Sequence, residues 1–205
     1  MGHGPVLNEK GKLNIHTETW HLNVDCCPCD VHFNDFVDVM GIRNAAIFHF
    51  GTGAHHVVGI AAAEGGRNNS VLAITASIGE HDSYVRLIVE HPEIGRAYKV
   101  YFGDIYQLEG RLLPDLDLVT LFHLCEFRTK VQDSYGALTD LELAQVLTDK
   151  LIPGGRLLFY TGSFAFDAAR SVIARLERKR PIVREPDFKT LRVYRKAGTA
   201  ATAFP

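Results

Sequence analysis

Residues 46–60 read Ala-Ile-Phe-His-Phe-Gly-Thr-Gly-Ala-His-His-Val-Val-Gly-Ile, and no other stretch says more about how this chain folds. A short apolar strand candidate leads into a turn with Gly51 and Gly53, and an apolar helix candidate follows. Because glycine has no Cβ, the turn can adopt φ values closed to other residues and a ligand can approach its backbone closely. The free N–H groups and positive dipole end of the helix point at the turn. The stretch predicts a site for a nucleotide-like molecule, although many glycine pairs of this kind bind nothing.

The composition is that of an ordinary globular protein, with 205 residues, 46% hydrophobic and 22% charged. A formal net charge of −2 offers no uniform attraction to nucleic-acid phosphates or anionic lipid. The sequence has neither a membrane-length apolar run nor a basic-then-apolar leader. We therefore expect a cytoplasmic protein that acts on a small molecule and binds neither nucleic acid nor membrane. A local basic face around residues 175–180 stays open as an alternative to a solvated helix end.

Apolar runs alternate with segments of helical periodicity, which is typical of a parallel sheet covered by helices on both faces. Strands are predicted at 45–50, 71–76, 98–102, 116–122 and 155–161, and helices at 30–40, 54–64, 80–91, 137–151 and 165–179. Two further strands, 182–188 and 191–195, are expected to form an antiparallel hairpin at one edge. This organisation predicts an arm or lid over residues 1–30, a single domain over 31–196 and a loose tail over 197–205.

The order of these elements, over roughly residues 30–196, resembles the class I S-adenosylmethionine-dependent methyltransferases. The segments that carry the resemblance are 47–55 (the Gly-x-Gly motif), 71–77 (the second strand), 100–105 (a Gly-Asp step), 116–126 (the fourth strand) and 151–160 (proline and paired glycines before a strand). The resemblance implies an α/β fold with a doubly wound, Rossmann-like, mostly parallel sheet of about seven strands. It also implies a ligand site at the carboxyl ends of the strands.

By the same resemblance, Gly51 and Gly53 would bind the cofactor S-adenosylmethionine, and Asp104 would meet its adenine. His49 stands where the first strand usually supplies a carboxylate, and Thr75 replaces the acid that holds the ribose hydroxyls, so the resemblance implies that both contact the cofactor. A threonine offers a neutral hydrogen bond, which is worth less than a charged one by about 1 kcal/mol or more. His55, in place of a third glycine, adds bulk and a potential positive charge.

An acid for the ribose could come from elsewhere in the chain. Glu80 and Asp82 follow the second predicted strand within a few residues. They either swing into the ribose site or simply cap and solvate the helix that begins there, and acids are common in the first turn of a helix.

The end of the fourth predicted strand offers one candidate catalytic residue. His123 could take a proton from an acceptor hydroxyl or amine, and Glu126 could hold its tautomer. The alternative is structural, because alternation along a strand would bury two of the residues His123, Cys125 and Glu126.

Three of the four cysteines lie close together at Cys26, Cys27 and Cys29. Cys26 and Cys29 have the spacing of half a zinc site, which His21, His32 or other histidines would have to complete. Without such a second pair we expect no metal, and the cysteines then pack beneath the edge of the sheet as part of the arm. Trp20, the only tryptophan, either covers a bound ligand or anchors the arm.

The sequence thus favours a methyltransferase that uses S-adenosylmethionine and acts on an oxygen or nitrogen of a small molecule. Two alternatives stay open. One is a catalytically silent Rossmann-like module for binding or assembly, and the other is a metal-binding protein built on residues 26–29. The terminal hairpin could pair across a dimer, so an oligomer is possible.

Overall fold

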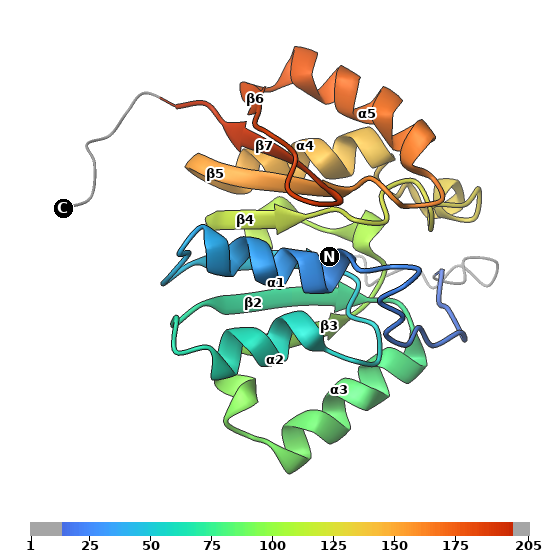
Figure 1. Cartoon of the computed structure of the whole chain (residues 1–205). Coiled ribbons are helices and arrows are strands. Elements are labelled where there is room, and N and C mark those ends of the chain that lie inside the picture. The colour runs from blue at the N-terminus through green and yellow to red at the C-terminus, as the bar shows by residue number, and fades with distance from the viewer. Residues whose placement is uncertain (1–13, 199–205) are drawn as a thin grey trace, which may run out of the picture.

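The structure, a computed structural model, describes residues 14–198 (Figure 1). Its strands are β1 (Ala46–Phe50), β2 (Ser70–Thr75), β3 (Tyr98–Phe102), β4 (Leu116–Thr120), β5 (Leu151–Tyr160), β6 (Ile182–Arg184) and β7 (Leu191–Lys196). Its α-helices are α1 (Cys29–Val39), α2 (Val57–Glu64), α3 (Ile78–Glu90), α4 (Asp140–Lys150) and α5 (Phe166–Lys179). Short 3-10 helices are η1 (Ile94–Arg96), η2 (Ile105–Gln107), η3 (Gly110–Leu112) and η4 (Gln132–Tyr135).

The strands form one sheet in the order β3-β2-β1-β4-β5-β7-β6. Neighbours from β3 to β5 pair in parallel, whereas β7 pairs antiparallel with both β5 and β6. The predicted doubly wound sheet with a C-terminal antiparallel hairpin is therefore confirmed. The order reverses at β1, and the carboxyl ends of β1 and β4 flank the crevice where such sheets bind ligands.

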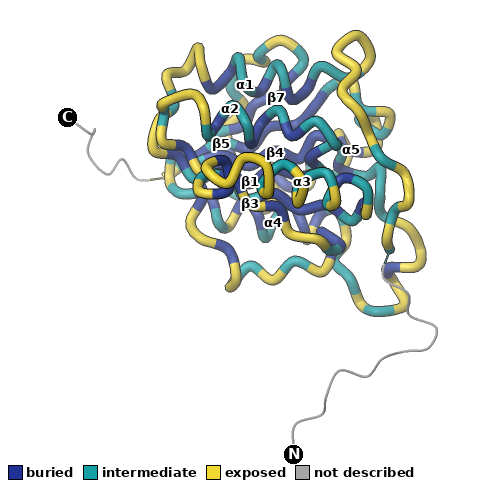
Figure 2. The backbone as a smooth tube through the Cα atoms, turned by 90° about the horizontal axis from the view of Figure 1, so that it is seen from below, coloured by how far each residue is buried: buried dark blue, intermediate teal, exposed yellow. Residues whose placement is uncertain are grey.

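Helices cover both faces of the sheet, so the central strands are apolar on both sides. Ile47 of β1 packs with α1 and α2, where Phe33 and Val58 are buried, while Phe48 packs with Leu143 of α4 on the opposite face. Figure 1 shows α1, α2 and α3 lying across one face, and Figure 2 shows the central strands largely buried beneath exposed loops. Burial on both faces explains why these strands read as continuous apolar runs in the sequence.

Several predicted boundaries differ from the structure, and the strand expected over 182–188 ends already at Arg184. The helix expected from 54 begins only at Val57, because His56 adopts a left-handed φ of 50° and ends the turn there. The strand expected over 116–122 ends at Thr120, and the strand expected from 155 already begins at Leu151. Residues 116 and 118 of β4 pair with 151 and 156 of β5. The extra residues of β5, which include the proline and glycines that predicted a turn, therefore form an irregularity within the strand pairing.

The arm lies along the edge of the sheet where the parallel strands end. His16 receives a backbone hydrogen bond from Ile78 and donates one to Ala76, at 3.2 and 2.9 Å, and Ala54 donates to the carbonyl of Trp20 at 2.7 Å. The limits of arm and domain stay predictions, and the predicted tail lies outside the described residues beyond position 198. Among residues 14–198, the helices are too short or too polar to cross a membrane.

Candidate functional site

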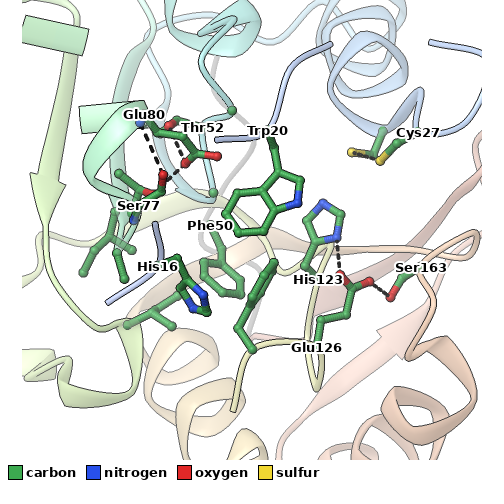
Figure 3. A pocket seen from close by; sticks show the side chains of 18 of the residues that line it. His16, Trp20, Cys27, Phe50, Thr52, Ser77, Glu80, His123, Glu126 and Ser163 are labelled. Carbon is green, nitrogen blue, oxygen red and sulfur yellow. Dashed lines mark hydrogen bonds and ion pairs between the residues drawn. The ribbon is translucent and has the colours of Figure 1, made fainter. Parts of the chain in front are cut away.

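A cavity of about 470 Å³ opens where the five parallel strands end (Figure 3). Each strand contributes at least one wall residue at or just after its end, among them Gly51, Thr75, Asp104, His123 and Tyr160. The arm and the start of α1 close the remaining side. The glycine turn and the Gly-Asp step therefore converge on one cavity, as the sequence predicted.

The two glycines of the turn have different roles. Gly51 has a φ of +82°, and a Cβ built on it would meet no atom within 4 Å. Gly53 has a φ of +51°, and a Cβ there would lie 2.3 Å from Nε2 of His55. Gly51 thus leaves free space at the cavity wall, whereas Gly53 makes room for the imidazole that replaces the third glycine of the motif.

Asp30, in the first turn of α1, places a buried carboxylate beside the turn. Its oxygens lie 3.6 Å from Nε2 of His49 and 3.7 Å from Nε2 of His55. Burial alone would raise the pKa of Asp30, but the two imidazoles lower it below its usual value. Burial in turn lowers the pKa of His55, so the neutral imidazole is favoured there.

The prediction that His49 contacts a cofactor is wrong, because this side chain is 2% exposed and does not line the cavity. Its Nδ1 lies 2.7 Å from the Thr120 hydroxyl, and its Nε2 faces Asp30. Asp30 lines the cavity instead and supplies a carboxylate close to the position where the first strand lacks one. In the sequence, Asp30 is distinguished only as an acid at the start of a helix.

Glu80 and Thr75 form a second polar group at the end of β2. Glu80 is 4% exposed, and its Oε2 accepts hydrogen bonds from the hydroxyls of Thr75 at 2.6 Å and Thr52 at 3.3 Å. Burial raises the pKa of Glu80, and the bonds from these hydroxyls oppose the rise. Of the two acids that follow β2, Asp82 is exposed, whereas Glu80 is buried at the cavity wall.

Asp104 follows the end of β3, the strand next to β2, and lines the cavity. Its Oδ1 accepts from the backbone N–H of Tyr106 at 2.9 Å, and its Oδ2 accepts from the Tyr135 hydroxyl at 2.5 Å. The side chain is therefore held in one orientation by η2 and η4. No sequence signal indicated Tyr135, because η4 follows a long connection whose path only the fold decides.

Aromatic rings line the cavity between the arm and the β4–α4 connection. Trp20 and Phe127 meet edge to face with centroids 5.4 Å apart, and His16 contacts both rings at 5.8 and 5.2 Å. Trp20 thus lines the cavity while its carbonyl ties the arm to the glycine turn. The two roles considered for this tryptophan are compatible.

His123 lies in the turn after β4, where the chain has already left the strand. Its Nδ1 lies 3.0 Å from Glu126, whose other oxygen accepts from the Ser163 hydroxyl at 2.5 Å. Burial alone would lower the pKa of His123, but Cys27 and Glu126 raise it to about 10. The neighbouring Cys125 does not line the cavity.

The cysteines gather differently from the sequence expectation. Cys26 is exposed, whereas the sulfurs of Cys27 and Cys29 lie 3.5 Å apart. A hydrogen bond with Cys29, together with the nearby His123, lowers the pKa of Cys27 to about 5, and burial opposes this shift. The hydrogen bond with Cys27 and burial raise the pKa of Cys29. The predicted pairing of Cys26 with Cys29 is wrong, because Cys27 takes that place.

Neither a protein-family model nor a curated protein matches this chain. Solved structures match well in shape, and the chain has the fold of class I S-adenosylmethionine-dependent methyltransferases, as the sequence resemblance predicted. TrmN from Thermus thermophilus has a TM-score of 0.56 and 13% identity over 82% of this chain, which spans 48% of TrmN. A putative rRNA methylase from Clostridium thermocellum has a TM-score of 0.59 and 10% identity over 83% of this chain and 96% of its own. The [4+2]-cyclase SpnF also has a TM-score of 0.59, with 12% identity over 89% of this chain and 87% of its own.

These neighbours correct one expectation. We expected a small-molecule substrate and excluded nucleic acid on net charge, and that exclusion is wrong because the putative rRNA methylase shares this fold. A net charge is a sum over the whole chain and does not describe the surface around one cavity. The [4+2]-cyclase adds that the fold alone does not fix the reaction.

Proposed function

We propose that the cavity binds S-adenosylmethionine and that the protein transfers its methyl group to a nucleophilic oxygen or nitrogen. The observation that carries the proposal is the convergence of the Gly51 turn, the Glu80–Thr75 pair and Asp104 on one cavity at the ends of the strands. Its volume of about 470 Å³ lies in the range of small-ligand pockets, about 300–1,000 Å³.

Each wall of the cavity suits one part of the cofactor. The free space at Gly51 lets the ligand lie against the backbone of the turn. Glu80, held by Thr75 and Thr52, accepts hydrogen bonds from the ribose hydroxyls in place of the acid missing from β2. Asp104 contacts the adenine amino group, with Tyr135 fixing the carboxylate.

The electrostatics of the turn suit a cationic ligand. Asp30 is a buried carboxylate whose lowered pKa favours its charged form. His55 has a lowered pKa, so it adds no positive charge beside the sulfonium or the methionine ammonium. The replacement of the third glycine by His55 is therefore compatible with binding.

When bound, the cofactor supplies an electrophilic methyl group, and the chain has to align an acceptor with it. The acceptor end is the wall formed by His123, Glu126 and Tyr160. Alignment alone lowers much of the barrier to such a displacement, so no strong base is needed. A base role for His123 stays a prediction.

Titration calorimetry with S-adenosylmethionine and S-adenosylhomocysteine tests the proposal. We expect micromolar binding of both ligands to the full chain, and weaker binding to the variant Gly51→Ala. Incubation with methyl-labelled cofactor and separate pools of RNA and of metabolites then identifies the acceptor class. The absence of both binding heat and a thermal shift at millimolar ligand would favour the silent module over the enzyme.

A further inference from the structure

Three soft metal-binding groups meet at one end of the cavity. One ligand atom each from Cys27, Cys29 and His123 lies within 4.8 Å of the others, and the two sulfurs are 3.5 Å apart. Two thiolates at about 2.3 Å from a tetrahedral zinc ion would be about 3.8 Å apart, so the observed sulfur separation needs only a small adjustment. A disulfide would require a separation of about 2.05 Å, which is far shorter.

The imidazole is oriented for ligation by residues outside the cluster. Glu126 lies 3.0 Å from Nδ1 of His123, which leaves Nε2 as the ligand atom toward the sulfurs. Ser163 donates to the other carboxylate oxygen of Glu126 at 2.5 Å and fixes its position (Figure 3). A metal-bound histidine commonly donates its second N–H to a carboxylate, which sets the ring orientation and increases the basicity of the ligand nitrogen.

We propose that Cys27, Cys29 and His123 bind a zinc ion whose fourth position faces the cavity. Two thiolates balance the charge of the ion, and N/S donors suit zinc better than the hard cations. All three residues line the cavity, and among residues 14–198 no other histidine, cysteine or acid has a ligand atom within 4.8 Å of all three, although an oxygen of Asp30 lies 3.5 Å from the sulfur of Cys29. Three protein ligands and one exchangeable position are the arrangement of catalytic rather than structural zinc sites.

The proposal replaces the sequence expectation of cysteines that only pack beneath the sheet. It does not depend on the proposed methyl transfer, because metal content and ligand-field spectra are measured without any cofactor. The exchangeable position would take water or an anionic sulfur ligand such as a small thiol, since zinc accepts both.

The test uses the full chain, purified without an affinity tag or chelator, with zinc measured by elemental mass spectrometry. We expect about one zinc ion per chain, and after replacement by cobalt a tetrahedral ligand-field spectrum with thiolate charge-transfer bands. A small thiol should add intensity to the charge-transfer bands. Metal-free wild-type protein, with Cys27 and Cys29 either reduced or oxidised to a disulfide, would overturn the site, and a spectrum insensitive to thiol would overturn the open position.

Variants separate this cluster from its neighbours. Cys27→Ser and Cys29→Ser should each lose bound zinc, whereas Cys26→Ser, at the adjacent exposed cysteine, should retain it. Glu126→Ala should weaken zinc affinity about 10- to 100-fold through the loss of the partner of the imidazole. Circular dichroism confirms that each variant folds. Equal zinc loss in Cys26→Ser and Cys27→Ser would contradict the assignment.

Discussion

Replacing Glu80 by glutamine tests how this chain compensates for the acid missing from the end of β2. The substitution keeps the shape of the side chain and an oxygen that accepts from Thr75 and Thr52. It removes the negative charge at the cavity wall and replaces the second oxygen by an amide NH2, from which a ribose hydroxyl can accept only a neutral hydrogen bond. Folding and ligand binding should therefore respond differently to it.

The magnitude follows from the hydrogen bonds of Glu80. Its Oε2 already accepts from the two threonines at 2.6 and 3.3 Å, so a ribose hydroxyl has to use mainly the other oxygen. A hydrogen bond to a charged group is worth about 1.5–3 kcal/mol, against about 0.5–1.5 kcal/mol for a neutral one. The variant should lose about 1–1.5 kcal/mol, which weakens S-adenosylmethionine binding about 5- to 12-fold.

The free energy of unfolding should change by less than about 1 kcal/mol, because relief from burying a charge offsets the weaker bonds from the threonines. Burial raises the pKa of Glu80, so its carboxylate becomes protonated on mild acidification and the affinity of the wild type falls toward that of the variant. Calorimetry across a pH series, together with urea unfolding, measures both quantities.

Asp82→Asn is the matched control, because Asp82 is an exposed acid in the same helix and its loss should leave binding unchanged. If Glu80→Gln binds the cofactor as tightly as the wild type at neutral pH, Glu80 does not contact the ribose. If both variants weaken binding equally, the loss comes from the summed negative charge of α3 and not from a contact between Glu80 and the ribose.

Three further perturbations test other parts of the structure. Gly51→Ala places a methyl group in free space at the cavity wall at a φ of +82°, so we expect a stability loss of about 1–2 kcal/mol and, by calorimetry, cofactor binding weakened about 10-fold or more. Burial lowers the pKa of His56 to about 4, against about 6.5 in an unfolded chain, so only the unfolded state gains the proton between these values and stability falls as the pH drops from 6.5 to 4. His56→Asn, which tolerates the left-handed φ of 50°, should flatten that dependence in urea unfolding, and an unchanged slope would assign it to another group. Thr139→Ala breaks the capping box with Glu142 and should cost about 1 kcal/mol, seen as a fall in Tm of about 2–4 °C with cofactor affinity unchanged.

The elements of the sheet were predictable because their signals are local. β3 occupies the predicted residues 98–102, and β1 and β2 differ from the prediction by one residue at their ends. The boundaries that failed depend on single backbone conformations. His56 ends the glycine turn at a left-handed φ, and the irregular pairing of β5 extends that strand through a proline.

The residues of the candidate site likewise include some that local sequence signals predicted and others that only tertiary packing brings together. Gly51, Thr75 and Asp104 follow predicted strands, and parallel strands bring their carboxyl ends to one edge, so their convergence could be expected. Asp30 beside His49 could not, because the packing of α1 against β1 decides that contact. Nor did the sequence indicate that Cys27, rather than the exposed Cys26, lies beside Cys29.

The sequence by itself determined the α/β class, the order of the strands along the chain and which residues follow the strands at the carboxyl edge of the sheet. These features depend on apolar periodicity and on glycine, which act over a few neighbouring residues. Only the tertiary structure decided which side chains meet at that edge. Contacts such as Cys29 with His123, or Thr52 with Glu80, join residues far apart in the chain, and their distances depend on how the helices and loops pack around the sheet.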